Sequence, residues 1–125
     1  MEPLIINKTD DTPAIHLDKA AGTFSFSGKS LPEDVTSFYA PVFAWIEAYA
    51  ASPNDVTNVV FKMTYFNTAS SKIILDVLMR FEDIHNAGST KVVIEWHHDE
   101  DDEDMQEAGE EYSEIVEIPF KFVAG

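Results

Sequence analysis

Hydroxyl side chains gather at the point where an apolar stretch of the chain ends and a helical pattern begins. This segment reads Asn67-Thr68-Ala69-Ser70-Ser71-Lys72. A helix N-terminus leaves backbone N–H groups without partners and carries partial positive charge, so side-chain oxygens are stabilised there. In the structural interpretation Thr68 is the N-cap of the helix and has no further role. Such a cap stabilises the protein by about 1 kcal/mol.

The functional interpretation treats the same segment as an anion site. A crevice beyond the carboxyl end of a strand, facing a helix N-terminus, is where α/β sheets bind anions. A phosphate esterified to Thr68 would be well placed there, and Asn67, Ser71 and Lys72 are the residues that would support it. Ser70 and Ser71 occupy the same end of the helix dipole and are the alternative phosphate acceptors. The segment lacks the glycines of a P-loop.

The flanking patterns predict a strand, a helix and a second strand. Residues 56–66 are apolar on both alternating faces, which is typical of a central strand. Apolar residues then keep helical spacing from Thr68 to Ala87, and Gly88 can take the left-handed conformation that ends a helix. Residues 91–96 form another strand-like run. Because such a unit almost always has parallel strands, we expect Thr68 at the carboxyl end of a central strand.

The rest of the chain predicts four more strands and one more long helix. A short apolar stretch at 4–6 precedes a β-hairpin with one apolar face, indicated by the alternating residues Ile15, Leu17, Phe24 and Phe26. The sequence Ser30-Leu31-Pro32-Glu33 has the form of a capping box and predicts a helix start. The stripe that follows runs to about Ser52, with Trp45 off its centre and a bend at Pro41. Residues 116–122 alternate again, and Pro119 places that strand at a sheet edge.

These patterns predict one α/β domain over residues 1–125, with a mixed sheet of about five or six strands and helices packed on it. The 8 basic and 23 acidic residues give a net charge of −15. Such a charge repels phosphate backbones and anionic membrane surfaces, so we expect no nucleic-acid and no membrane partner. Met1-Glu2-Pro3 lacks the pattern of a signal peptide, and a cytoplasmic location is expected.

Eleven of the acidic residues, and no basic one, fall within residues 99–117, and residues 99–113 form an acidic excursion between two strands. The carboxylate spacing is close to that of a calcium loop, but Asp104 stands where the loop needs glycine. We therefore predict a solvated acidic turn and short helix that steers a basic partner, and no metal site. His97 and His98 are adjacent on a strand, point to opposite faces and cannot chelate one ion together.

No enzyme chemistry is indicated. The chain has no Cys, and Ser70 and Ser71 have no His at a recognisable spacing. No glycine-rich loop is present to hold a nucleotide, and no cofactor is expected. A phosphorylation-controlled binding module is favoured over two alternatives: an acidic interaction or nucleic-acid-mimic module, also considered as a metal buffer, and a small hydrolase.

Several specific elements of the sequence occur together. The longest are YFNTASSKIILDVLMRFEDIHNAG at 65–88 and VVIEWHHDEDDEDMQEAGEEYSEIVEIPF at 92–120, and shorter ones lie at 12–15, 30–34 and 41–49. Through them nearly the whole chain resembles the SiaC family of regulatory phosphoproteins. The resemblance implies a fold similar to the STAS domain of anti-sigma-factor antagonists (SpoIIAA-like).

The resemblance also implies a function. It suggests a switch protein in cyclic di-GMP signalling that a Ser/Thr protein kinase phosphorylates on Thr68 and a protein phosphatase restores. The unphosphorylated form would bind and activate a diguanylate cyclase. The Asp-Ser-Ser-Gly motif usual in STAS domains is replaced here by Asn67-Thr68-Ala69-Ser70, which keeps Ser70 and Ser71 as alternative acceptors.

Overall fold

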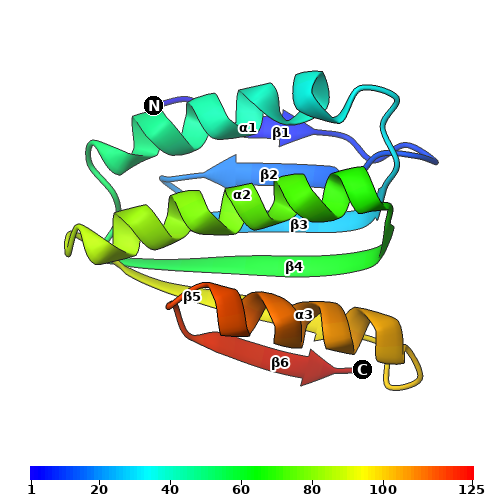
Figure 1. Cartoon of the computed structure of the whole chain (residues 1–125). Helices are drawn as coiled ribbons and strands as arrows, with labels where there is room; N and C mark the ends of the chain where they lie inside the picture. Colours follow the sequence, from blue (N-terminus) through cyan, green and yellow to red (C-terminus); the bar gives the residue numbers. More distant parts are fainter.

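The computed structural model describes residues 1–125 and contains six strands and three helices (Figure 1). In chain order these are β1 (Leu4–Ile6), β2 (Ala14–Asp18), β3 (Thr23–Ser30), α1 (Val35–Ala50), β4 (Val56–Phe66), α2 (Thr68–Asn86), β5 (Lys91–His98), α3 (Glu103–Ile115) and β6 (Phe120–Ala124). None of the helices combines the length and the apolar composition that crossing a membrane requires.

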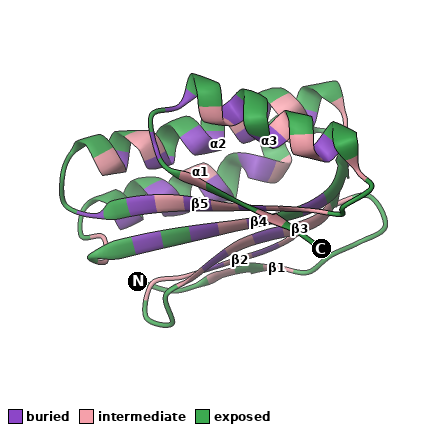
Figure 2. Ribbon diagram, turned by 90° about the horizontal axis from the view of Figure 1, so that it is seen from below, coloured by how far each residue is buried: buried purple, intermediate pink, exposed green.

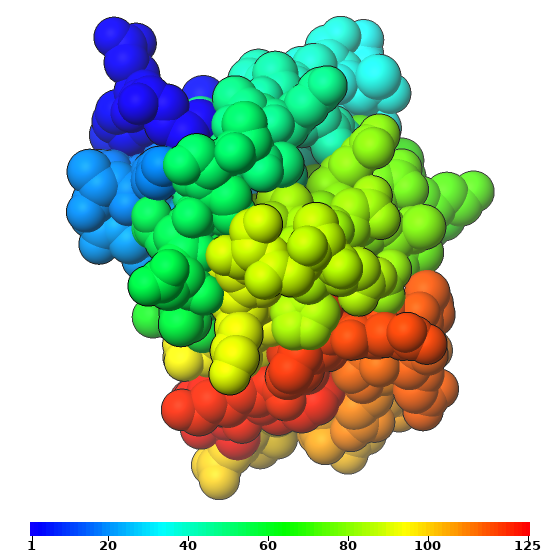
Figure 3. Space-filling model, turned by 90° about the vertical axis from the view of Figure 1, so that its left-hand side faces the viewer, coloured from blue at the N-terminus to red at the C-terminus, as the bar shows by residue number.

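The strands form one mixed sheet in which spatial order follows chain order. β1, β2 and β3 pair antiparallel, whereas β3, β4, β5 and β6 pair parallel. Figure 3 shows the same progression on the surface, from N-terminal residues at one edge to C-terminal residues at the other. The predicted mixed sheet, the hairpin and the parallel β4-α2-β5 unit are confirmed.

All three helices lie on the same face of the sheet (Figure 2). The core fills the space between them, and on β4 and β5 it is built from Val59, Phe61, Met63, Val92, Ile94 and Trp96. Aromatic rings continue it across the strands: Phe26 stacks on Phe61 at 4.7 Å between centroids, and Phe61 on Trp96 at 5.4 Å. β4 is central as predicted, but its second apolar face is uncovered, and Val56 there is 57% exposed.

The start of α1 differs from the capping-box prediction. Ser30 is the last residue of β3, buried and paired with Phe66 of β4, so it is not a helix cap. The N-cap is Asp34, whose Oδ1 accepts a hydrogen bond from the Ser37 backbone N–H at 3.1 Å. The Ser37 hydroxyl also donates to the Asp34 carboxylate, and the two hydrogen bonds from Ser37 lower the pKa of Asp34. Pairing with β4 keeps the chain extended through Ser30, and the next suitable capping residue begins the helix.

Trp45, which the sequence places off the centre of the α1 stripe, is nevertheless buried. It is 8% exposed, stacks on Tyr49 at 5.1 Å, and donates from Nε1 to the Glu2 carbonyl at 2.9 Å. The N-terminal segment therefore covers this flank of α1.

The last strand begins later than predicted. β6 starts at Phe120 and forms the edge of the sheet, which confirms the edge position. Val116 and Ile118 are buried ahead of it, although they are not part of the strand. Pro119 has no N–H to donate, but its carbonyl accepts from Ile94 N–H at 2.9 Å, so the ladder begins just after it.

Gly109 generates a prediction about how α3 packs. A Cβ atom at Gly109 would lie 2.5 Å from Cδ1 and 2.6 Å from Nε1 of Trp96, whose Nε1 donates to the Met105 carbonyl. Alanine normally stabilises a helix over glycine by about 1 kcal/mol. We expect the opposite sign for Gly109→Ala, a loss of about 1–3 kcal/mol through overpacking.

The measurement is the free energy of unfolding in urea. Glu107→Ala, at an exposed position of the same helix, is the control and should change stability by less than about 0.5 kcal/mol. A Gly109→Ala protein as stable as the wild type would contradict the close packing of α3 on Trp96.

Candidate functional site

The candidate site is the junction between the end of β4 and the start of α2. One residue, Asn67, joins them, and its backbone N–H donates to the Ser30 carbonyl of the neighbouring strand β3 at 3.4 Å. Asn67 is also the N-cap of α2, since its Oδ1 accepts from the Ser70 backbone N–H at 2.9 Å. The prediction that Thr68 is the N-cap is therefore wrong. Asn caps helices at least as well as Thr, and here it is the residue left extended after β4.

Thr68 is instead the first residue of α2, and it is exposed. Its hydroxyl takes part in none of the hydrogen bonds of the molecule, because Asn67 performs the capping. The hydroxyl therefore stands at the positive end of the helix dipole, open to solvent and without a structural task. An anion attached there meets first-turn N–H groups of the helix.

Ser70 has the opposite environment. It is 0% exposed, and its hydroxyl donates to the Ser30 carbonyl at 2.8 Å while accepting from the Ser30 Oγ at 2.8 Å. The Ser30 Oγ is in turn 2.8 Å from the hydroxyl of Tyr39 on α1, and burial raises the pKa of Tyr39. This buried chain of Ser70, Ser30 and Tyr39 fastens the start of α2 to β3 and α1. Modification of Ser70 would have to break it.

Ser71 joins α2 to α3. The Tyr112 hydroxyl donates to the Ser71 carbonyl at 2.8 Å and lies 3.1 Å from the Ser71 Oγ. Lys72 is exposed and enters no hydrogen bond or ion pair, so its ammonium group is available on the first turn of α2. Of the residues singled out in the sequence, Thr68 and Lys72 are therefore free, whereas Asn67, Ser70 and Ser71 hold the site together.

The sequence did not indicate Ser30, Tyr39 or Tyr112 as parts of this site. Ser30 was assigned to a helix cap, and the two tyrosines count only as apolar positions in helical stripes. Their shared feature is a hydroxyl buried in a layer of apolar side chains. Such a group must find a hydrogen-bond partner, but sequence spacing does not identify which one.

The acidic segment forms the short helix that the sequence predicts. Asp102 caps α3 by accepting from the Met105 N–H at 3.0 Å, and acidic residues in the first turn complement the helix dipole. Met105, Gly109 and Tyr112 are buried against the sheet, so only the other side of α3 is solvated. No three His, Asp or Glu side chains are grouped so as to hold a metal ion, and His97 instead lies 2.7 Å from Glu95.

Comparison with known proteins places this chain in a family. A model described as SiaC family regulatory phosphoprotein matches residues 6–125. This chain belongs to the SiaC family. An uncharacterised protein of Pseudomonas aeruginosa strain UCBPP-PA14 is 34% identical over 124 residues, which are 99% of this chain and 98% of that protein.

Solved structures show the same family likeness. SiaC of Pseudomonas aeruginosa has 33% sequence identity and a TM-score of 0.90 over 100% of both chains. A chain from the crystal structure of the diguanylate cyclase SiaD in complex with its activator SiaC, from the same organism, has 34% identity and a TM-score of 0.90, covering 98% of this chain and 99% of that one. The predicted STAS-like α/β fold of a SiaC regulatory phosphoprotein is thus confirmed.

The capping geometry generates a prediction for this SiaC-family site. Asn67→Ala should lower the free energy of unfolding by about 1 kcal/mol, because the Ser70 N–H loses its partner. Thr68→Ala should change it by less than about 0.5 kcal/mol, because the Thr68 hydroxyl bonds to nothing. Urea unfolding of the two variants side by side is the measurement. Equal losses at both positions would show that Thr68 shares the capping.

Burial of the Tyr112 phenol between α2 and α3 should make the free energy of unfolding fall at alkaline pH. Burial raises the pKa of Tyr112 to about 12, above the value of about 10 that an unfolded chain has. Between these values the unfolded chain releases the proton while the folded chain keeps it, so the stabilisation present below about pH 10 is lost as pH rises. Tyr112→Phe should flatten this decline in urea unfolding.

The matched control is Tyr65→Phe, at a tyrosine that is 54% exposed. Its stability should decline with pH as steeply as that of the wild type. If Tyr112→Phe shows the wild-type slope as well, the phenol of Tyr112 is not held in its neutral form by the fold.

Proposed function

We propose that this chain is a signalling switch in which reversible phosphorylation of Thr68 controls binding to, and activation of, a diguanylate cyclase. A Ser/Thr protein kinase would add the phosphate and a protein phosphatase would remove it. Cyclic di-GMP production by the cyclase would then follow the phosphorylation state of the chain. The unphosphorylated form is the one that binds.

Family membership supports the regulatory part of this proposal. The family is described as regulatory phosphoproteins, and SiaC of Pseudomonas aeruginosa is the activator in the complex with the cyclase SiaD. The likeness extends over nearly the full length of both chains at 34% identity. A partner-binding role therefore fits the whole fold and not only one motif.

The single observation that carries the assignment of Thr68 is its free, exposed hydroxyl on the first turn of α2, between residues that are bound into the structure. A kinase can reach this hydroxyl without unfolding anything. Ser70 is buried, and the Ser71 Oγ contacts the Tyr112 hydroxyl. These serine hydroxyls contact other hydroxyls and backbone instead of a general base, which favours a regulator over an enzyme.

The same position explains how a phosphate would act. It adds a charge of about −1.5 to −2 and three acceptor oxygens. The fold should tolerate it, because the dipole of α2 favours an anion and Lys72, four residues further along the helix, lies on the same side. A partner that packs over a neutral Thr68 must instead desolvate a dianion, which costs binding free energy.

Phosphate mapping and a binding titration test the proposal. Mass spectrometry of the protein purified from its own cells should place phosphate on Thr68, and the kinase should not label Thr68→Ala. Thr68→Ala should bind the cognate cyclase like the wild type. Thr68→Asp should bind it more than tenfold more weakly, a loss above about 1.4 kcal/mol.

Ser89→Asp is the control for added charge, because Ser89 is exposed beyond the opposite end of α2. It should leave cyclase binding within about threefold of wild type, since surface charges act over about 8 Å at physiological salt. Full labelling of Thr68→Ala, or cyclase binding by Thr68→Asp at wild-type strength, would refute the assignment of Thr68.

A further inference from the structure

A groove runs between α1 and α2 on the outer side of the helix layer. One part of it has a volume of about 330 Å³ and a neighbouring part about 500 Å³. The two parts share Phe43, Arg80 and Asp83, so they form one continuous depression. Along α1 it extends from Thr36 to Ala50, which at 1.5 Å per residue is about 20 Å, or four helical turns.

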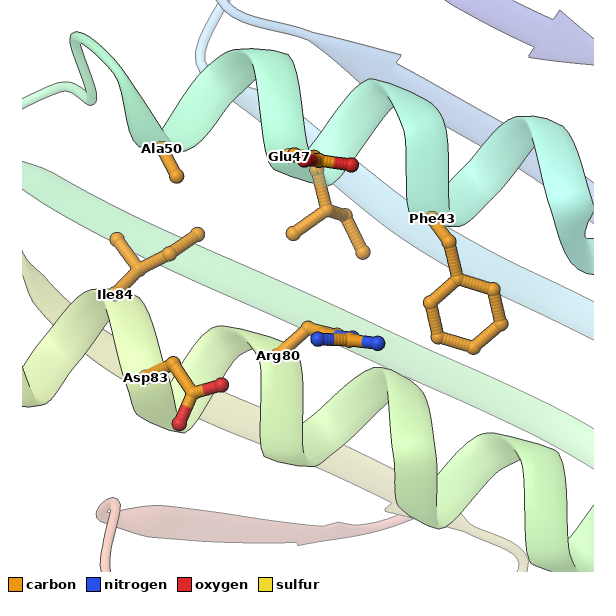
Figure 4. Close-up of a pocket in the computed structure, with 7 residues that line it drawn as sticks. Phe43, Glu47, Ala50, Arg80, Asp83 and Ile84 are labelled. Carbon is orange, nitrogen blue, oxygen red and sulfur yellow. The ribbon is translucent and has the colours of Figure 1, made fainter.

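Six of the eleven residues that line the groove are apolar. Figure 4 shows side chains of α1 and α2 meeting in the space between the two helices, with Phe43 on one side and Ile84 on the other. Ile46, which is buried, also lines this part of the groove. Met79 stands at the groove margin and is 43% exposed. A flexible, polarisable Met at the edge of an apolar surface is typical of sites that adapt to a bound helix.

The charged residues of the groove are mostly acidic and have no partner within the chain. Glu47, Asp76 and Asp83 line it, and none of them forms an ion pair. The one base, Arg80, is also unpaired, and its guanidinium lies 5.8 Å from the centroid of the Phe43 ring. The groove therefore presents three carboxylates and an apolar floor, on a chain whose net charge is −15.

We propose that the α1–α2 groove is the docking site for an amphipathic helix with basic flanking residues, supplied by the partner enzyme. The identity of that enzyme rests on the proposed function; the chemistry of the helix does not. Helices dock in apolar grooves through residues spaced at i, i+3 or i+4 and i+7, and four turns of groove accommodate such a stripe. Lys or Arg beside the stripe would meet Glu47, Asp76 and Asp83, and the net charge would steer a cationic segment toward them.

The end of the groove at Glu47 and Asp83 lies well away from the phosphorylation site. Asp83 is fifteen residues after Thr68 on the same helix, about 22 Å along its axis, whereas Ile73 and Asp76 at the near end are five and eight residues after it. At the far end the phosphate is beyond the Debye length of about 8 Å, so its direct effect on Asp83 is screened. We therefore expect the effects of variants at Glu47 and Asp83 on binding to multiply with the effect of Thr68→Asp.

The test compares two pairs of charge reversals with the same change in net charge. Glu47→Lys with Asp83→Lys reverses the groove, and Glu107→Lys with Glu114→Lys reverses exposed positions of α3. The probes are the cognate cyclase and an 18-residue helical peptide of Leu and Lys at amphipathic spacing, each titrated against the folded full-length chain. At physiological salt the groove pair should bind both probes at least tenfold more weakly. The α3 pair should stay within about threefold, because long-range steering by the α3 carboxylates is largely screened at that salt concentration.

A second comparison tests the apolar contacts. Met79→Ser should weaken peptide binding severalfold, whereas Ile115→Ser, at another exposed apolar residue, should not. Equal weakening by the groove and α3 pairs would mean that net charge alone acts and would overturn the inference.

The outcomes also separate this inference from the proposed function. If the cyclase responds to Thr68→Asp but binds the groove pair like the wild type, the inference fails and the proposed function stands. If the wild type does not bind the cyclase, the proposed function fails. In that case the peptide alone tests the groove. Loss of peptide affinity only in the groove pair would support the inference, and equal peptide binding by both pairs would overturn it.

Discussion

The region around Thr68 depends on one chain of buried hydroxyl groups. Ser70, Ser30 and Tyr39 join α2, β3 and α1 through three hydrogen bonds, each of 2.8 Å. A buried hydroxyl without a partner costs roughly 1–3 kcal/mol, so these three groups constrain one another strongly. Indeed, no buried side-chain nitrogen or oxygen of the molecule lacks a partner. With the first turn of α2 fixed in this way, Thr68 is held at the surface while the residue two positions later is inaccessible.

Periodicity in the sequence predicted the elements well, because burial on one face imposes it. The hairpin, the central strand β4, the full length of α2 and its end two residues before Gly88 follow from such patterns. The errors concern caps. Ser30 and Thr68 both satisfy local capping rules, yet Asp34 and Asn67 cap the helices. Several neighbouring residues can cap a helix equally well, and pairing of β3 with β4 decides among them, which is a long-range constraint that local sequence does not contain.

The sequence predicts only part of the candidate site, because long-range contacts decide the rest. The position of the site follows from a strand that is directly followed by a helix. Which of its hydroxyl groups are buried and bonded, and which are free, depends on the elements that pack against them. Tyr112 comes from a segment more than forty positions away and reaches Ser71 only because α3 lies over β5. A polar contact at that separation has no sequence signature. An apolar stripe along α3 indicates that Tyr112 is buried but not that its hydroxyl bonds to α2.

The one-sided arrangement of the helices also gives the molecule an uneven charge distribution. The strands carry four exposed lysines, Lys29, Lys62, Lys91 and Lys121, whereas α3 carries six acids and no base. The helices are therefore net negative and the strands net positive, and Thr68 and the α1–α2 groove both lie in the helix layer (Figure 1). Asn67 caps α2 and Ser70 anchors it, so a phosphate on Thr68 would leave the hydrogen bonds of the fold intact. In the proposed switch its effect would therefore fall on a partner that binds this surface, and not on the conformation of this chain.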